Sequence, residues 1–300
     1  MKLGLIGVPS SAGAHGPGQE KAPVALRKAG LLGALREAGI EVEDLGDLPV
    51  TRFQPDPANR KRQSRSGVIK VARQVADQVA TAVERELVPL VLGGDCTISL
   101  GVVAGLVRGQ PDLGVMYFDG DADMTTPETT HSGIFDSMGV SHLIGEGDPE
   151  VAHLGPRFPL VPPDRITLFG FHPYEVEPNE QRLLDKSAIA LYPVTSMGDR
   201  PVERAAEALA RLEERARAIV VHFDVDVMDS AEIPLSNWPH YDALSFGDAM
   251  RCLRVFVGTE KLAALVVTEL NPDHDPDGLL VGQFVDAFVD ALRPVAAARR

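Results

Sequence analysis

The stretch Phe118–Gly133, FDGDADMTTPETTHSG, begins at the end of the apolar run LGVMYF and carries three aspartates spaced two apart. Side chains of an extended chain alternate between two faces, so Asp119, Asp121 and Asp123 share one side wherever strand geometry continues. Three carboxylates on one side of a low-dielectric pocket repel one another unless a cation lies between them. The stretch therefore predicts either a metal site at a strand end or a solvated acidic turn.

A second stretch, IVVHFDVDVMDS at Ile219–Ser230, repeats the pattern of an apolar run that leads into aspartates two apart, here Asp224 and Asp226. Two further apolar runs lead to Cys96 and Glu269 in VPLVLGGDC and LAALVVTELNP. Ligands bind at the carboxyl edge of the sheet in open α/β folds. Four strand ends that carry acidic residues or a thiol favour an oxygen-rich site over solvated turns.

Apolar runs alternate with helical patterns along the chain, such as the amphipathic segment 67–87 and a closing segment over 282–300. Continuous apolar strands separated by helices are typical of a parallel sheet covered on both faces. We therefore expect an α/β protein with a three-layer α/β/α architecture and a central, mainly parallel sheet. Since no linker-like stretch separates two cores, residues 1–300 are predicted to form a single domain.

The net charge, the number of cysteines and the lengths of the apolar runs indicate which partners and which compartment to expect. The chain has 43 acidic and 29 basic residues and a formal net charge of −14, which argues against nucleic acid and is compatible with a cationic small molecule. The two cysteines, Cys96 and Cys252, fit a reducing compartment rather than a disulfide scaffold. The first apolar run is too short for a signal peptide, and no run approaches the roughly 18 residues of a membrane span. We expect a cytoplasmic protein without a membrane partner.

The motifs quoted above resemble those of the ureohydrolase family, which includes arginases, agmatinases and formiminoglutamases. The family's G-G-D-H motif corresponds to Gly93–Cys96, its D-A-H-A-D-x-N-T-P-E-T motif to Asp119–Thr129, and its S-F-D-x-D-x-x-D-P motif to His222–Ser230. The amino-terminal GVPSSAGAHGPGQEKAPVALRKAGLL also resembles the family's opening strand, loop and helix, so the resemblance spans nearly the whole chain. It implies the arginase-like fold and hydrolysis of a linear C–N bond in a guanidine or amidine, with release of urea or a urea-like product.

The resemblance also implies two divalent ions, usually manganese, that activate water for attack on the guanidinium carbon. Asp119, Asp123, Asp224 and Asp226 match the four aspartate ligands of the family. Glu269 matches the acid that pairs with the substrate guanidinium, a cation that suits a carboxylate.

Both ligand histidines of the family are replaced here, one by Cys96 and the other by Asp121. Five aspartates and a thiolate exceed the charge of two divalent ions, so a proton on Cys96 or Asp121, a further cation or a different metal arrangement must remove the excess. A thiolate would shift the preference from manganese toward zinc or iron, whereas a neutral thiol is a weak ligand. With these two positions included, the candidate metal ligands are Cys96, Asp119, Asp121, Asp123, Asp224 and Asp226.

Cys96 has two further interpretations. It could be a small buried hydrophobe, the commonest fate of a free cysteine, or a nucleophile with a nearby histidine. The spacing singles out no partner among His131, His142, His222 and His240. His222 precedes Asp224 by two residues, so it either shares the side of the strand that faces the site or is a core histidine.

Proton transfer and substrate binding involve further departures from the family. Asp136 aligns with the family's proton-relay histidine, and His131 is our candidate to replace that relay. Ser132 matches a substrate-side serine, and Glu175 lies where the family has an aspartate that can bind the substrate amine. Trp238 either walls the substrate pocket or fills the core of its loop. Glu269, Asp136 and His131 are thus the catalytic candidates, and Ser132, Glu175, Trp238 and Glu269 the substrate-binding ones.

The altered loops predict a substrate other than plain arginine. A competing hypothesis is a non-catalytic or regulatory relative with a degraded metal site, since both motif histidines are lost. A zinc-dependent deacetylase-like hydrolase is disfavoured because the histidine pairs of that family are absent. The resemblance further implies a homo-oligomer, a trimer or a hexamer.

Overall fold

The computed structural model describes residues 1–297 and is built on one eight-stranded sheet. The strand order is β3-β1-β5-β10-β9-β6-β7-β8, and every neighbouring pair is parallel. The strands of this sheet are β1 (Lys2–Gly7), β3 (Glu41–Asp47), β5 (Val88–Leu92), β6 (Leu113–Phe118), β7 (Ile166–Phe169), β8 (Ala190–Tyr192), β9 (Ala218–Asp224) and β10 (Leu262–Thr268). The predicted parallel sheet is confirmed.

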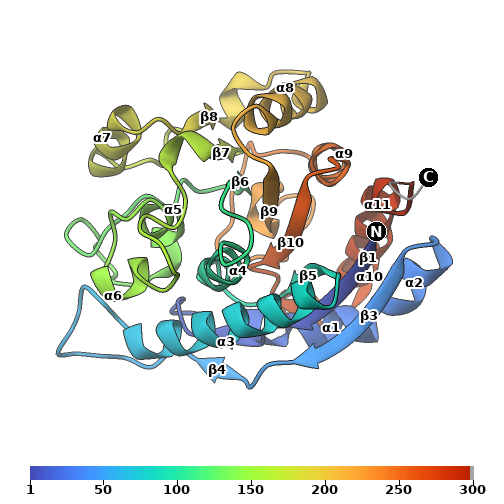
Figure 1. Cartoon of the computed structure of the whole chain (residues 1–300), viewed down its shortest axis with the longest axis horizontal. Coiled ribbons are helices and arrows are strands. Elements are labelled where there is room, and N and C mark those ends of the chain that lie inside the picture. Colours follow the sequence, from blue (N-terminus) through green and yellow to red (C-terminus); the bar gives the residue numbers. More distant parts are fainter. Residues whose placement is uncertain (298–300) are drawn as a thin grey trace.

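Helices cover both faces of the sheet, as the prediction of three layers requires (Figure 1). One face packs against α1 (Ala22–Lys28), α2 (Leu31–Glu37), α8 (Pro201–Glu213), α9 (Phe246–Val257) and α10 (Leu279–Ala291). The other packs against α3 (Arg65–Glu84), α4 (Ile98–Leu106), α5 (Gly139–Leu143), α6 (Pro149–Ala152) and α7 (Pro178–Lys186). A separate two-stranded sheet pairs β2 (Ser10–Ser11) with β4 (Thr51–Arg52).

Strand β6 shows how the apolar sequence builds both cores. Met116 and Phe118 belong to one hydrophobic cluster, while Val115 and Tyr117 belong to the other. Because successive side chains of a strand point to opposite faces, an uninterrupted apolar run is what a strand buried on both sides requires.

The predicted closing helix over 282–300 is wrong in one respect. The helix α10 ends at Ala291, and a short helix, α11 (Arg293–Ala297), follows as a separate element. Pro294 explains the break, since proline lacks the amide proton that a continuing helix needs. The last three residues of that prediction lie outside the described residues.

The strand order decides where the motifs meet. The four strands followed by the acidic and thiol residues, β5, β10, β9 and β6, are consecutive neighbours in the sheet. All run parallel, so their carboxyl ends lie at one edge. Within residues 1–297, no helix is long and apolar enough to cross a membrane.

Candidate active site

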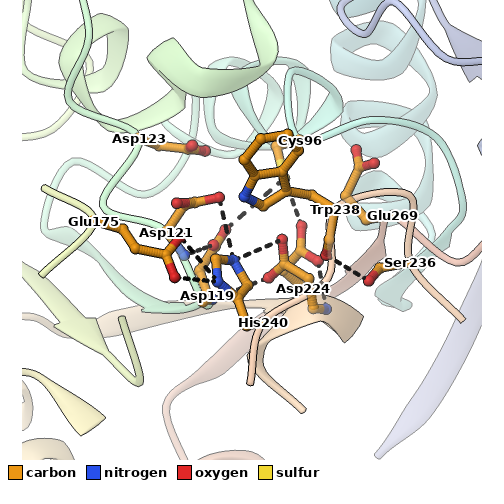
Figure 2. A network of polar contacts seen from close by, with 12 residues as sticks. Cys96, Asp119, Asp121, Asp123, Glu175, Asp224, Ser236, Trp238, His240 and Glu269 are labelled. Atoms are coloured by element: carbon orange, nitrogen blue, oxygen red, sulfur yellow. Dashed lines mark hydrogen bonds and ion pairs between the residues drawn. The ribbon is translucent and has the colours of Figure 1, made fainter. Parts of the chain in front are cut away.

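One pocket of about 550 Å³ lies at this edge of the sheet. Its lining contains all of the residues that the sequence predicted for the site: Cys96, Asp119, Asp121, Asp123, His131, Ser132, Asp136, Glu175, Asp224, Asp226, Trp238 and Glu269. Figure 2 shows the carboxylates of Asp119, Asp121, Glu175 and Asp224 close to His240, while those of Asp123 and Glu269 lie further out. The parallel sheet thus brings together side chains that are more than a hundred residues apart in the chain.

Two of these residues adopt left-handed backbone conformations. Asp123 has φ of 48° and Glu269 has φ of 62°, each of which costs about 1–3 kcal/mol for a residue other than glycine. Hydrogen bonds hold both turns: Glu269 N donates to Gly94 O at 3.0 Å, and Asp123 O accepts from Val140 N at 3.1 Å. Such strain is concentrated at functional sites, where the surrounding structure over-determines the backbone.

Cys96 is a buried residue of the pocket lining, and its thiol is hydrogen-bonded. The thiol donates to Asp224 Oδ2 at 2.7 Å, and Thr268 Oγ1 donates to the same oxygen at 3.0 Å. Burial, together with the charges of Asp224 and Asp119, raises the pKa of the Cys96 thiol well above its usual value. Among these groups alone, Cys96 is therefore a neutral thiol.

His222 lies directly behind this group of residues and is completely buried. Its Nε2 is 3.1 Å from Asp119 Oδ2 and its Nδ1 is 2.7 Å from Ser99 Oγ, while the ring stacks on Tyr117 with 3.9 Å between centroids. Burial lowers the pKa of His222 to about 3, so the ring is neutral. His222 thus combines the two interpretations left open by the sequence: it is a satisfied core histidine that also contacts a site carboxylate.

A second group of residues joins Asp121, Asp226 and His240. His240 is completely buried, with Nε2 3.4 Å from Asp121 Oδ2 and 3.8 Å from Asp226 Oδ2, and with Nδ1 3.3 Å from a carboxylate oxygen of Glu175. Burial alone would lower the pKa of His240, but the contacts with Asp121 and Glu175 outweigh it and raise that pKa. Sequence spacing did not single out His240, since only the path of its loop brings it here.

A third group, Asp136 and Glu269, lies beside Cys96. Cys96 N donates to Asp136 Oδ1 at 2.8 Å, and Gln19 Nε2 donates to Glu269 Oε2 at 2.7 Å. The other Glu269 oxygen, Oε1, is buried and has no hydrogen-bond partner among the described residues. Burial and the neighbouring negative charges raise the pKa of both carboxyl groups well above their usual values.

The remaining predicted residues line the outer part of the pocket. His131 is exposed, and its Nε2 lies 3.5 Å from Glu177. Ser132 Oγ lies 3.3 Å from Thr130 Oγ1, within the turn that it stabilises. Trp238 is 62% exposed, so the alternative in which it fills the core of its loop is wrong, and it walls the pocket instead.

The residues present fit divalent cations. Three groups of candidate ligands have their donor atoms within 4.8 Å of one another: Cys96, Asp119, His222 and Asp224; Cys96, Asp136 and Glu269; Asp121, Asp226 and His240. Burial and mutual repulsion raise the pKa of Asp119, Asp123 and Asp226, because no positive charge nearby compensates their ionised forms. A bound cation would supply that charge. The buried, unpartnered Oε1 of Glu269 belongs to the lining of this pocket, and the buried, unpartnered Nε2 of His240 lies 3.4 Å from Asp121, another lining residue.

Comparison with known proteins shows the family of this chain. The Arginase family profile matches residues 1–288. The chain belongs to the arginase family. This confirms the resemblance to ureohydrolases and the arginase-like fold that the motifs implied.

Individual relatives agree with this assignment. Arginase-1 of Homo sapiens is 31% identical over 275 residues, which cover 90% of this chain and 85% of the human protein. The arginase structure of Bacillus caldovelox superposes with a TM-score of 0.89 at 25% identity, covering 97% of each chain. The proclavaminate amidino hydrolase of Streptomyces clavuligerus shares the fold, with a TM-score of 0.72 at 19% identity over 98% of this chain and 92% of that one.

Proposed function

We propose that this protein is a metal-dependent hydrolase that cleaves a linear C–N bond of a guanidine or amidine and releases urea or a urea-like product. Membership of the arginase family supports the general reaction. The observation that carries the proposal is Glu269 Oε1, a buried carboxylate oxygen without a partner in a pocket rich in aspartates.

The metal ligands of the proposal come from the two D-x-D motifs and Cys96. The residues that would hold two manganese ions are Asp119, Asp121, Asp123, Asp224 and Asp226, with Cys96 as a further candidate. Divalent ions in this pocket would lower the pKa of water and polarise the substrate. The neutral thiol of Cys96 supports manganese, because hard oxygen ligands suit it and a thiol is a weak ligand, whereas a thiolate would support zinc or iron.

Glu269 would recognise the substrate guanidinium. Its Oε2 is held by Gln19 at 2.7 Å, which leaves Oε1 to accept from a guanidinium N–H. Hydrogen bonds between a carboxylate and a guanidinium are about twice as strong as neutral ones. Binding a cation here would also favour the ionised form of the Glu269 carboxyl group.

Asp136 and His131 would handle protons. Asp136 shares the pocket with Glu269, and burial among negative charges raises its pKa, which suits a group that takes up and returns a proton. His131 stands at the exposed rim beside Glu177, where a proton can exchange with solvent.

Substrate specificity would come from the outer pocket, through Ser132, Glu175 and Trp238. The family's asparagine beside Ser132 is replaced by Ile134, which supports a substrate other than plain arginine. We also propose that the protein is cytoplasmic and forms a homo-oligomer, a trimer or a hexamer, as its family membership suggests.

One observation favours a second candidate, a non-catalytic or regulatory relative. The Cys96 thiol satisfies Asp224 through its own hydrogen bond of 2.7 Å, so part of the site is internally compensated without a metal. The two candidates differ in whether the purified protein turns over any guanidine.

A substrate screen tests the proposed function. The manganese-loaded protein is incubated with guanidines and amidines that differ in chain length and charge, and urea or the corresponding amide product is measured. We expect turnover of at least one substrate that is lost on chelation and restored by manganese. Absence of turnover across the panel, with the metals bound, would favour the non-catalytic relative.

A further inference from the structure

His240 comes from the loop between β9 and α9, yet its ring is completely buried at the carboxyl edge of the sheet. Its Nε2 is 3.4 Å from a carboxylate oxygen of Asp121 (Figure 2). It is also 3.8 Å from Asp226 Oδ2, and it has no hydrogen-bond partner among residues 1–297. Buried polar nitrogens are nearly always partnered. An imidazole nitrogen that converges with two carboxylates matches the donor set of a bound cation.

The backbone of the loop fixes this position. Ser230 N donates to His240 O at 2.9 Å, and Asp229 N donates to Leu244 O at 2.8 Å. The Asp229 carboxylate closes the loop by accepting from Ala243 N at 3.3 Å. His240 therefore reaches the site because its loop is tied back against the end of β9.

Gly120 makes room for the ring. A Cβ on Gly120 would lie 2.5 Å from His240 Cδ2 and 2.8 Å from His240 Nε2. The family motif has alanine at this position and histidine at the next, where this chain has Gly120 and Asp121. The ring of His240 thus occupies the space that an alanine side chain at position 120 would need. It lies next to position 121, where this chain lacks the histidine of the motif.

We propose that His240 supplies the imidazole ligand of a divalent cation held with Asp121 and Asp226, in place of the histidine that the motif lacks. Glu175, 3.3 Å from Nδ1, is then a positioning residue that accepts from Nδ1–H and leaves the Nε2 lone pair for the ion. The inference deepens the proposed function and rests on it for the presence of a metal. Its rival is a protonated His240 that acts as an internal cation among the carboxylates.

Metal binding to the full chain tests the assignment. Cobalt and manganese are titrated by calorimetry, with elemental analysis of the dialysed protein, on the wild type, His240→Gln and the control His172→Gln. His172 lines the pocket and its ring stacks on that of His240, with 5.7 Å between centroids; its Nε2 is likewise unpartnered, but it makes no ion pair with a carboxylate within the described part of the chain. We expect His240→Gln to weaken one of two sites by about tenfold or more and to change the cobalt absorption spectrum, and His172→Gln to do neither.

Gly120 provides an independent variant. Gly120→Ala should weaken the same metal site as His240→Gln, because the new methyl group displaces the ring. The double variant Gly120→Ala/Asp121→His rebuilds the motif and should bind two ions whether or not His240→Gln is added. If His240→Gln weakened metal binding equally in the wild type and in the double variant, the proposal would be contradicted.

A spectroscopic measurement detects the coordinated nitrogen directly. Pulsed electron paramagnetic resonance of manganese-loaded protein with ¹⁵N-labelled histidine should detect a coordinated nitrogen, and His240→Gln should remove that signal. Two tightly bound ions without a coordinated nitrogen, or full affinity in His240→Gln, would assign His240 as an internal cation instead. Absence of metal binding by the wild type would overturn both this ligand and the metal of the proposed function, whereas metal binding without turnover would overturn only the proposed hydrolase activity.

Discussion

At the scale of single residues, burial decides the chemistry of the site. Cys96, Asp119 and Glu269 have raised pKa values because each is buried among like charges, whereas His222 has a pKa lowered to about 3 by burial alone. The sequence predicted which acidic residues meet. It could not predict that Cys96 is a hydrogen-bonded neutral thiol, because that depends on the 2.7 Å contact with Asp224.

Glu269→Gln should lower kcat/KM for the guanidine substrate by about 10- to 100-fold, since one charge-assisted hydrogen bond contributes about 1.5–3 kcal/mol. Metal content should remain unchanged, because Glu269 is not among the residues proposed to hold the ions. Glu260→Gln, at the opposite end of β10 and exposed, is the matched control. Steady-state kinetics with both variants check this prediction, and unimpaired turnover by Glu269→Gln would remove the proposed role.

Cys96→Ser should reduce manganese affinity by less than about threefold, because a neutral thiol is a weak ligand and serine can also donate to Asp224. Calorimetric titration with manganese and with zinc checks this. A large loss that is greater for zinc than for manganese would instead identify Cys96 as a thiolate ligand.

At the scale of elements, strand ends were predictable and loop paths were not. Continuous apolar runs separated by helical segments predicted β5, β6, β9 and β10. Because the sheet is parallel, the carboxyl ends of these strands meet at one edge. The loop that carries His240 has no periodic pattern, and its course depends on tertiary hydrogen bonds such as that from Ser230 N. Short polar segments of this kind leave no local signal in a sequence.

His142 links α5 to the start of α6 and makes stability depend on pH. It lies between Met138 O, 2.6 Å from Nδ1, and Asp148 N, which donates to Nε2 at 2.9 Å. Burial lowers its pKa from 6.5 to about 4, so the unfolded chain takes up a proton first as the pH falls. The contribution of neutral His142 to stability is therefore complete above pH 6.5 and is lost toward pH 4, at up to about 1.4 kcal/mol per pH unit.

Urea unfolding of the wild type and of His142→Asn between pH 7.5 and 4.5 checks this. Asparagine does not titrate, so the stability advantage of the wild type should shrink as the pH falls below 6.5. An advantage that stays constant with pH would show that the folded protein does not hold His142 neutral.

At the scale of the whole molecule, one sheet with a hydrophobic cluster on each face carries an acidic pocket at its edge. The shared sheet supports our proposal that residues 1–300 form a single domain. It also means that the carboxylates are fixed by the folding of the entire chain, so their repulsion reduces the stability of the metal-free protein.

Manganese should therefore raise the melting temperature, and more so at pH 8 than at pH 5.5. The raised pKa values of Asp119, Asp123 and Asp226 mean that their protonated forms stabilise the metal-free fold below the unfolded pKa, and that this stabilisation is lost as pH rises through the folded-state pKa. A ligand at a hundred times its Kd adds about 2.7 kcal/mol. Calorimetric melting with and without chelator checks this, and an equal or opposite pH trend would contradict it.

The central claim, that the aspartates at this sheet edge hold a metal centre, is tested most directly by elemental analysis. Protein is purified without added metal and measured before and after manganese loading, for the wild type, Asp224→Asn and the control Glu128→Gln, an exposed acid of the same motif as Asp119. We predict close to two manganese ions per chain in the wild type and in Glu128→Gln, and a loss in Asp224→Asn. No stoichiometric metal in the wild type under either condition would contradict the account and favour the non-catalytic relative.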